Sequence, residues 1–233
     1  MTDPTLEQLS EQLDSPNSRD RLMALAQLRE FPAEEAFPLL KKVLYDEHLP
    51  VRSMAILGIG VKETEESFPL LVKLLVEDED YGIRADAAGA LGYLGDIRAF
   101  EPLVRAFFED TTWLVQFSAA VALGNLEDPR AFDVLMKALK SDESVIQLAA
   151  IGALGEIKAT QAIEDLLVFV QSEDWMIRRR LSESLGNLPS EKSLAALQYL
   201  AKDDHPQVRD AAIAALQVIQ ANETATTVES ESR

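Results

Sequence analysis

One short pattern returns seven times along this chain at an almost constant spacing, and it constrains the fold more than any other feature. Each copy has Arg or Gln at a position that we call the marker, with a small or apolar residue three positions later and Leu or Ile seven positions later. So steady a period indicates one structural unit repeated in tandem. The markers are Arg21, Arg52, Arg84, Gln116, Gln147, Arg178 and Arg209, at spacings of 31, 32, 32, 31, 31 and 31 residues.

The residues around each marker predict an amphipathic helix. Positions −1, +3 and +7 relative to the marker lie on one helical face, and they are apolar in almost every copy. Asp or Ser stands six residues before every marker, which is typical of a turn ahead of a helix. The +3 column is Ala24, Ala55, Ala87, Ala119, Ala150, Leu181 and Ala212, and the −6 column is Ser15, Asp46, Asp78, Asp110, Ser141, Ser172 and Asp203.

The other half of each period predicts a second helix, for example over residues 99–107. Pro38, Pro69 and Pro102 are expected in the first turn of this helix, where a missing N–H is tolerated. A glycine also recurs eight residues after the marker, which indicates a close backbone approach or a helix end. These glycines are Gly60, Gly92, Gly124, Gly155 and Gly186.

Two helices in 31 or 32 residues cannot bury their apolar faces alone, so the stacking of neighbouring repeats has to supply the core. We therefore expect an all-α fold, a right-handed α-solenoid of about seven two-helix repeats over residues 3–219. Residues 220–233 are polar, acidic and poor in large apolar side chains, and we predict a disordered tail there.

Composition narrows the classes of partner. A net charge of −18 at pH 7 argues against nucleic acid, because proteins gain affinity for it by neutralising phosphates with Lys and Arg. The same charge disfavours anionic membrane surfaces. The chain has no cysteine, so it forms no disulfide and holds no thiolate-bound cluster. Because it shows neither a secretory signal nor an apolar run long enough to span a membrane, we expect a soluble cytoplasmic protein.

Groups suited to catalysis are sparse. The two histidines, His48 and His205, each stand four residues before a marker, in repeats two and seven. At ~10 Å per repeat they are too far apart to share a metal, and we expect both to be exposed turn residues. Metalloprotease, P-loop and nucleophile-elbow motifs are absent from the sequence. We therefore expect no catalytic residue, no metal site and no intrinsic cofactor, although enzymatic activity stays open at this point.

The marker helix has a second face that is a candidate binding surface. Positions +1, +2, +5 and +9 lie opposite the apolar seam, and in repeats three to six they carry many Ala, Gly, Phe and Leu residues. Such a row indicates a shallow apolar groove, unless curvature or the tail covers it. The residues predicted to bind a ligand or partner there are Asp86, Tyr93, Phe117, Ser118, Asn125, Glu156, Arg179, Arg180, Glu183 and Asn187.

Tyr81, Trp113 and Trp175 share one position, three residues before a marker. They either staple the start of the marker helix or form an aromatic rim of an interface. We also expect each marker Arg to pair with a turn Asp, which would build a polar ladder between repeats. The role of such a ladder is mainly structural, and each exposed pair contributes little on its own.

The complete pattern resembles the short HEAT-like repeats of the phycobilisome lyase class, found in E/F-type phycobilin lyases and in a related phycobilisome-degradation protein of cyanobacteria. Residues 80–92 and 113–124 carry the resemblance most clearly, and it extends over the whole predicted solenoid. The resemblance implies a scaffold that binds phycocyanobilin or a phycobiliprotein subunit, for chromophore attachment, transfer or removal. A cyanobacterial HEAT protein that partners A-type iron–sulfur carriers is similar as well, so an adaptor without catalysis is the alternative.

Under the first interpretation, an apolar groove takes the pyrrole rings of the bilin. Arg179 and Arg180 would pair with its propionates, and Asp86 or Glu156 would accept hydrogen bonds from pyrrole N–H groups. The acceptor thiol would belong to the partner, because this chain has no cysteine.

Overall fold

A computed structural model describes the backbone of residues 4–231 and the side chains of residues 4–222. Within this described part, the regular structure consists of α-helices and short 3-10 helices, without a strand. The chain divides into two compact units, residues 1–122 and 123–233, and the boundary falls inside helix α8 (Trp113–Asn125). Consecutive repeats stack within each unit, which confirms the predicted all-α solenoid; its right-handed sense and its extent as one domain over 3–219 stay predictions.

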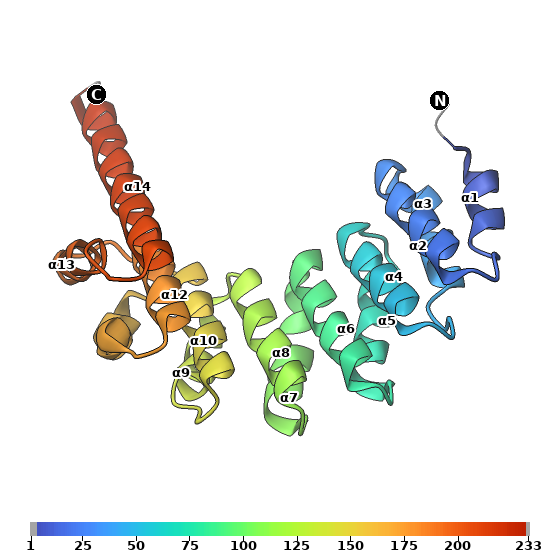
Figure 1. The fold of residues 1–233 in the computed structure, drawn as a ribbon, viewed down its shortest axis with the longest axis horizontal. Coiled ribbons are helices and arrows are strands. Elements are labelled where there is room, and N and C mark those ends of the chain that lie inside the picture. The colour runs from blue at the N-terminus through green and yellow to red at the C-terminus, as the bar shows by residue number, and fades with distance from the viewer. Residues whose placement is uncertain (1–3, 232–233) are drawn as a thin grey trace. The chain divides into compact units, whose positions relative to one another are not determined.

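In the first unit, the marker helices α2, α4 and α6 pack one after another, and α1, α3 and α5 pair with them as hairpins (Figure 1). The elements that lie wholly in this unit are α1 (Leu6–Gln12), α2 (Ser18–Gln27), η1 (Leu28–Glu30), α3 (Ala33–Lys42), α4 (Leu49–Val61), α5 (Ser67–Glu77), α6 (Tyr81–Leu94), η2 (Ile97–Ala99) and α7 (Phe100–Glu109).

The second unit repeats this arrangement with α10, α12 and α14 as its consecutive marker helices (Figure 1). Its elements after α8 are η3 (Pro129–Ala131), α9 (Phe132–Ala138), α10 (Ser144–Glu156), η4 (Thr160–Ala162), α11 (Ile163–Leu167), η5 (Val168–Gln171), α12 (Trp175–Gly186), α13 (Glu191–Leu200) and α14 (Pro206–Glu231).

The predicted seam forms the core. All seven residues of the +3 column are completely buried, and so are most of those at −1 and +7. Because Ala occupies six of the seven +3 positions, successive marker helices approach closely while larger neighbours such as Ile59 and Leu91 fill the remaining space. The helical register predicted from the repeat is therefore confirmed.

The glycines eight residues after the marker serve the close approach of helices rather than a left-handed helix end. A Cβ built on Gly60 would lie 2.7 Å from the carbonyl oxygen of Ala90 in the next marker helix, and one on Gly124 would lie 2.7 Å from the Cα of Ala153. Each contact joins position +8 of one marker helix to position +6 of the next, so both columns have to stay small.

The turn before each marker helix is built as the −6 column predicts, with one refinement. The side chain of the Asp or Ser accepts a hydrogen bond from the backbone N–H two residues later, as Asp46 does from His48 and Asp110 does from Thr112. That later residue is the N-cap of the marker helix, and at Asp80 its own side chain accepts bonds from the first turn.

One prediction about the first helix of each repeat is wrong. Pro69 and Pro102 lie in the first turn of α5 and α7, but Pro38 lies in the interior of α3. The helix α3 begins earlier in its repeat, with Pro32 as N-cap, whereas a 3-10 turn precedes α7 at the corresponding place. The spacing between Pro38 and the marker therefore does not predict where Pro38 lies within α3, because the first helix starts at a different point in this repeat.

The prediction of a disordered tail over residues 220–233 differs from the observed backbone, which is helical to Glu231. Helix α14 continues through this segment to Glu231, because the sequence beyond the last buried residue, Ile219, contains no Gly or Pro to end it. The side chains from residue 223 onward lie outside the described residues, and disorder of the tail stays a prediction.

Candidate functional site

The marker arginines form the expected ladder. In the first six repeats, each marker arginine binds the turn aspartate of the following repeat through an ion pair whose N–O distance is 2.7 or 2.8 Å. Gln stands at the marker only where Ser replaces this aspartate, so the two columns change together. The pairs are Arg21–Asp46, Arg52–Asp78, Arg84–Asp110 and Arg178–Asp203.

Electrostatics in the ladder favour the charged forms. The hydrogen bond from the Arg178 guanidinium holds the pKa of Asp203 below its ordinary value, against the opposing effect of burial. The same guanidinium donates to the carbonyl oxygen of Ser172 at 2.6 Å, which ties together two consecutive turns. These groups stabilise the stack, and they are not free to act on a ligand.

In the first unit, the predicted binding residues of α6 lie on one open helical face. Tyr93 is exposed, Asp86 is half-buried, and a Cβ built on Gly89 between them would meet no atom within 4 Å. Burial is the main cause that raises the pKa of Asp86, and the nearby Asp80 adds to it, while a hydrogen bond from Ser53 acts in the opposite direction. None of the groups that shift the pKa of Asp86 is a cation.

The other predicted residues of this face are less open than the row suggested. Phe117 and Ser118 of α8 are half-buried, and Ala85 is buried. In the second unit Ala149 and Gly152 are buried, whereas Asn125 and Glu156 are exposed. The marker-helix face thus offers separate accessible places in each unit, and the predicted binding role of its residues stays a prediction.

Sequence reasoning missed an apolar pocket on the same face, in repeats one and two. We call it the α2–α4 hollow, and its volume is about 250 Å³. Met54, Leu57 and Val61 contribute from positions +2, +5 and +9 of their repeat, the same offsets that define the predicted row, so extending that row to earlier repeats would have found it. Its lining is Leu25, Leu28, Arg29, Leu40, Met54, Leu57, Gly58, Val61 and Lys62.

In the second unit, three predicted residues line one pocket of about 540 Å³ between α12 and α14, which we call the α12–α14 pocket. Arg179, Glu183 and Asn187 lie along its α12 side. The α14 side consists of Gln207, Asp210, Ala211, Ala214, Ala215 and Val218. The structure therefore brings together part of the predicted set on a surface with small apolar residues.

The two predicted arginines share one carboxylate. Arg179 donates to Glu183 at 3.0 Å, and Arg180 donates to the other oxygen of the same residue at 3.2 Å. The guanidinium of Arg180 lies where a side chain on Gly152 of α10 would begin, with Nε only 2.1 Å from that Cβ position. Arg180 is thus packed onto the neighbouring helix, whereas Arg179 is 48% exposed and borders the pocket.

The aromatic residues three positions before the marker are the first residues of their helices. Tyr81 and Trp113 are 55% and 50% exposed in the first unit. Trp175, in the second unit, is half-buried and stacks on the ring of His205 with centroids 4.1 Å apart. His48 is an exposed turn residue as predicted, but His205 is half-buried by this stacking, so that part of the prediction is wrong.

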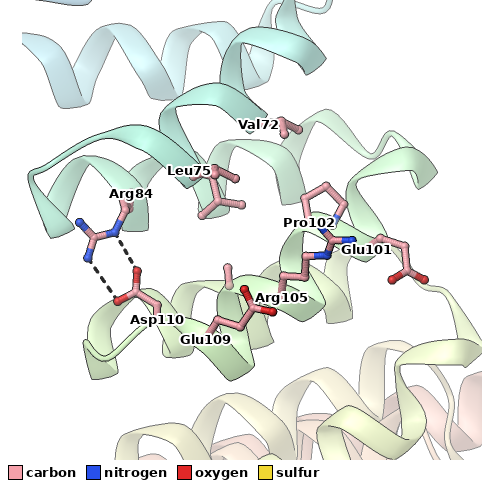
Figure 2. A pocket seen from close by; sticks show the side chains of 10 residues that line it. Val72, Leu75, Arg84, Glu101, Pro102, Arg105, Glu109 and Asp110 are labelled. Carbon is pink, nitrogen blue, oxygen red and sulfur yellow. Dashed lines mark hydrogen bonds and ion pairs between the residues drawn. The ribbon is translucent and has the colours of Figure 1, made fainter.

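A further crevice lies on the opposite face, between the first helices α5 and α7, with a volume of about 510 Å³. Figure 2 shows the Arg84–Asp110 ion pair at one end and the side chains of Glu101, Arg105 and Glu109 along α7. Because charged groups occupy much of its wall, this crevice is a less apolar surface than the α2–α4 hollow.

Two absences apply to the described residues. No group of three or more His, Asp or Glu side chains there is arranged to hold a metal ion. Among the same residues, no helix combines the length and the hydropathy that crossing a membrane requires.

Comparisons with known proteins agree with this architecture. A sequence model described as HEAT repeats matches three overlapping stretches, residues 6–92, 68–151 and 133–217. A search of curated proteins returned no match.

Solved structures resemble the chain in fold. The complex of CpcE and CpcF of phycocyanin lyase from Nostoc sp. PCC7120 is 22% identical with a TM-score of 0.63, over 95% of this chain and 96% of that chain. A structure of Kap95p with RanGDP is 16% identical with a TM-score of 0.57, over 91% of this chain and 34% of that chain. An engineered protein is 24% identical with a TM-score of 0.52, over 94% of this chain and 68% of that chain. At such low identity these likenesses establish the fold alone.

Proposed function

Because the chain belongs to the HEAT-repeat family, we propose that it is a binding scaffold that handles a phycobiliprotein or its bilin chromophore during attachment, transfer or removal. The α12–α14 pocket is the observation that carries this proposal. It combines an exposed arginine, Arg179, with small apolar residues on α14, at a place that the structural ladder does not use.

The chemistry of the pocket suits an elongated ligand that is apolar along its length and anionic at one edge. The pyrrole rings of a bilin pack against Ala211, Ala214 and Val218, and one propionate displaces Glu183 from the guanidinium of Arg179. Asn187 adds an amide at the same wall. Because the chain has no cysteine, the bilin stays non-covalently bound and available to a thiol of the partner.

The similarity in fold to the Nostoc complex supports this choice of ligand class for the first test. That complex is described as phycocyanin lyase, and the match extends over almost all of both chains. Scaffolds that lack a catalytic constellation act by holding one reactant in position for another.

The experiment is a titration of the full chain with phycocyanobilin, followed by absorbance, and with a purified phycobiliprotein subunit, followed by calorimetry. Replacing Arg179, the arginine that borders the pocket, by Ala should weaken binding by about 2–5 kcal/mol where the charge is desolvated in the complex. The matched control removes one exposed lysine outside the pocket, Lys140, and should leave affinity within experimental error. Equal affinities of all three proteins would contradict the proposal.

Trp113 favours a second candidate, a protein-binding adaptor without a chromophore, for instance one for an A-type iron–sulfur carrier. Its indole is half exposed at the start of α8, and exposed tryptophans are enriched at the centres of protein interfaces. Replacing Trp113 by Ala should then weaken binding of a protein partner and leave the affinity for free phycocyanobilin unchanged. Binding of a carrier without any absorbance change on adding bilin would favour this adaptor.

A further inference from the structure

The α2–α4 hollow has the dimensions of a socket for one large side chain. Its floor is the buried core, with Leu25, Leu28 and Leu40, and its volume is about 250 Å³. Gly58 keeps it open, because a Cβ there would lie 2.8 Å from a methyl carbon of Leu40.

Large apolar side chains remain exposed around this socket. Leu57 is 39% exposed and Val61 is 67% exposed, and both belong to its wall. Met54 completes this side, and its flexible thioether adapts to ligands of different shape. Burial of these three side chains by an occupant would be favourable, since each has apolar surface in contact with water.

A carboxylate lies one helix further along the same face. Asp86 of α6 stands at the same offset from its marker, +2, as Met54 does in the neighbouring helix α4, so both belong to the same face of two packed marker helices. The accessible space over Gly89, one turn after Asp86, lets the backbone of an occupant come close to α6. The socket and the half-buried carboxylate thus lie on neighbouring marker helices.

We propose that this surface binds a peptide segment of a partner protein that presents a large aliphatic side chain beside a lysine or arginine. The aliphatic side chain fills the α2–α4 hollow, and the basic group pairs with Asp86, whose burial makes a cationic partner favourable. This inference rests on the proposed function as a scaffold and adds the chemistry of a second contact.

Charges at the other end of the hollow set the direction of the segment. Arg29 is exposed there, and Lys62 donates through its ammonium group to the carbonyl oxygens of Arg29 and Phe31 at 2.7 and 2.6 Å. Two cations disfavour a basic group at that end, so the basic residue of the segment lies toward Asp86.

The experiment uses a fluorescein-labelled amphipathic peptide composed of Leu and Lys and a matched peptide composed of Leu and Glu, with the full chain, at two salt concentrations. Fluorescence anisotropy should show tighter binding of the Leu/Lys peptide. Leu57→Asp and Asp86→Asn should each weaken it about tenfold or more, because the first places a charged group in the apolar wall of the socket and the second removes the charge of the carboxylate. Val61→Asp replaces the first variant if Leu57→Asp lowers the thermal midpoint.

Matched controls separate this contact from general attraction to an acidic protein. Val76→Asp introduces the same charge at a 68% exposed valine of α5, and Glu79→Gln removes an exposed carboxylate, and both should leave affinity within about twofold. Equal effects of variants and controls, a preference for the Leu/Glu peptide, or no binding would overturn the inference. Self-association of the chain that Leu57→Asp abolishes would also overturn it, by identifying a second copy as the occupant.

The peptide-binding experiment can fail without affecting the function proposed for the α12–α14 pocket. If Arg179→Ala loses bilin or phycobiliprotein binding while Leu57→Asp and Asp86→Asn leave Leu/Lys peptide binding unchanged, the scaffold function stands and this inference fails.

Discussion

The close contact between marker helices at Gly60 gives a sharp test of the packing account. In Gly60→Ala, the new Cβ would lie 2.7 Å from the carbonyl oxygen and 2.8 Å from the Cα of Ala90. Both atoms belong to backbone in the middle of α6, so relief requires a shift of one helix against another. Overpacking of this kind costs about 1–3 kcal/mol, and the better helix propensity of Ala offsets at most about 1 kcal/mol of it.

Gly89 provides the matched control in the same unit. It lies inside α6, and a Cβ there would meet no atom within 4 Å, so only the helix propensity changes in Gly89→Ala. We expect this variant to gain about 0.5–1 kcal/mol. The two variants should therefore shift the free energy of unfolding in opposite directions, as measured by urea denaturation followed by circular dichroism. A stabilised Gly60→Ala, or equal shifts in both variants, would refute the contact between positions +8 and +6.

Three other changes test the core, the turns and the tail, and a fourth tests the ladder. Ala119→Leu should cost about 1–3 kcal/mol because the residue is completely buried in the seam, and an unchanged thermal midpoint would show that the helical register is wrong. Lys158→Gly should gain up to about 1 kcal/mol in urea denaturation, since Lys158 has a φ of 54° that only Gly adopts without strain. Deleting residues 222–233 should leave the thermal midpoint unchanged, because the tail is predicted to bury little apolar surface, and a marked drop would show that it docks. Asp203→Asn should lower the free energy of unfolding at neutral pH, because it removes a carboxylate whose pKa is lowered in the folded state. The difference between variant and parent should shrink as the pH falls below about 4, where the aspartate of the parent becomes protonated. A difference that is constant with pH would contradict this account.

The repeat was sufficient to predict most of the fold, because its columns correspond to physical constraints that recur in every copy. The +3 residues are buried, the marker arginines bind the aspartates of the next turn, and the +8 glycines make the close approaches. The exception at Pro38 arises because helix ends depend on local turns, which differ between repeats although the spacing to the marker does not.

The exposure of the candidate binding residues was harder to predict, since it depends on how neighbouring helices cover each position. Offset +5 illustrates this: Gly152 is covered by the guanidinium of Arg180, whereas Leu57 at the same offset is exposed. The pairing of Arg179 with Glu183 follows from helical spacing, but the packing of Arg180 onto the preceding marker helix does not.

Likewise, the stacking of Trp175 on His205 joins residues that are far apart in sequence. The other members of the Trp175 column are mostly exposed, and the His205 column elsewhere holds ordinary polar turn residues, so the single sequence carried no signal for the contact. Knowledge of the three-dimensional neighbours was required to separate Trp175 from Tyr81 and Trp113, which remain open to solvent.

The central claim is that the marker-helix face is the binding surface, and hydroxyl-radical footprinting tests it most directly. The full chain would be oxidised with and without a saturating phycobiliprotein subunit, and the rate of modification compared side chain by side chain. The account predicts protection of Val218 in the α12–α14 pocket and of Met54 and Tyr93 in the first unit, with unchanged rates at Phe108 of α7 and Tyr199 of α13, which are exposed on the first helices of their repeats. Protection at Phe108 or Tyr199 with unchanged rates at Val218, Met54 and Tyr93 would contradict it and assign binding to the opposite face.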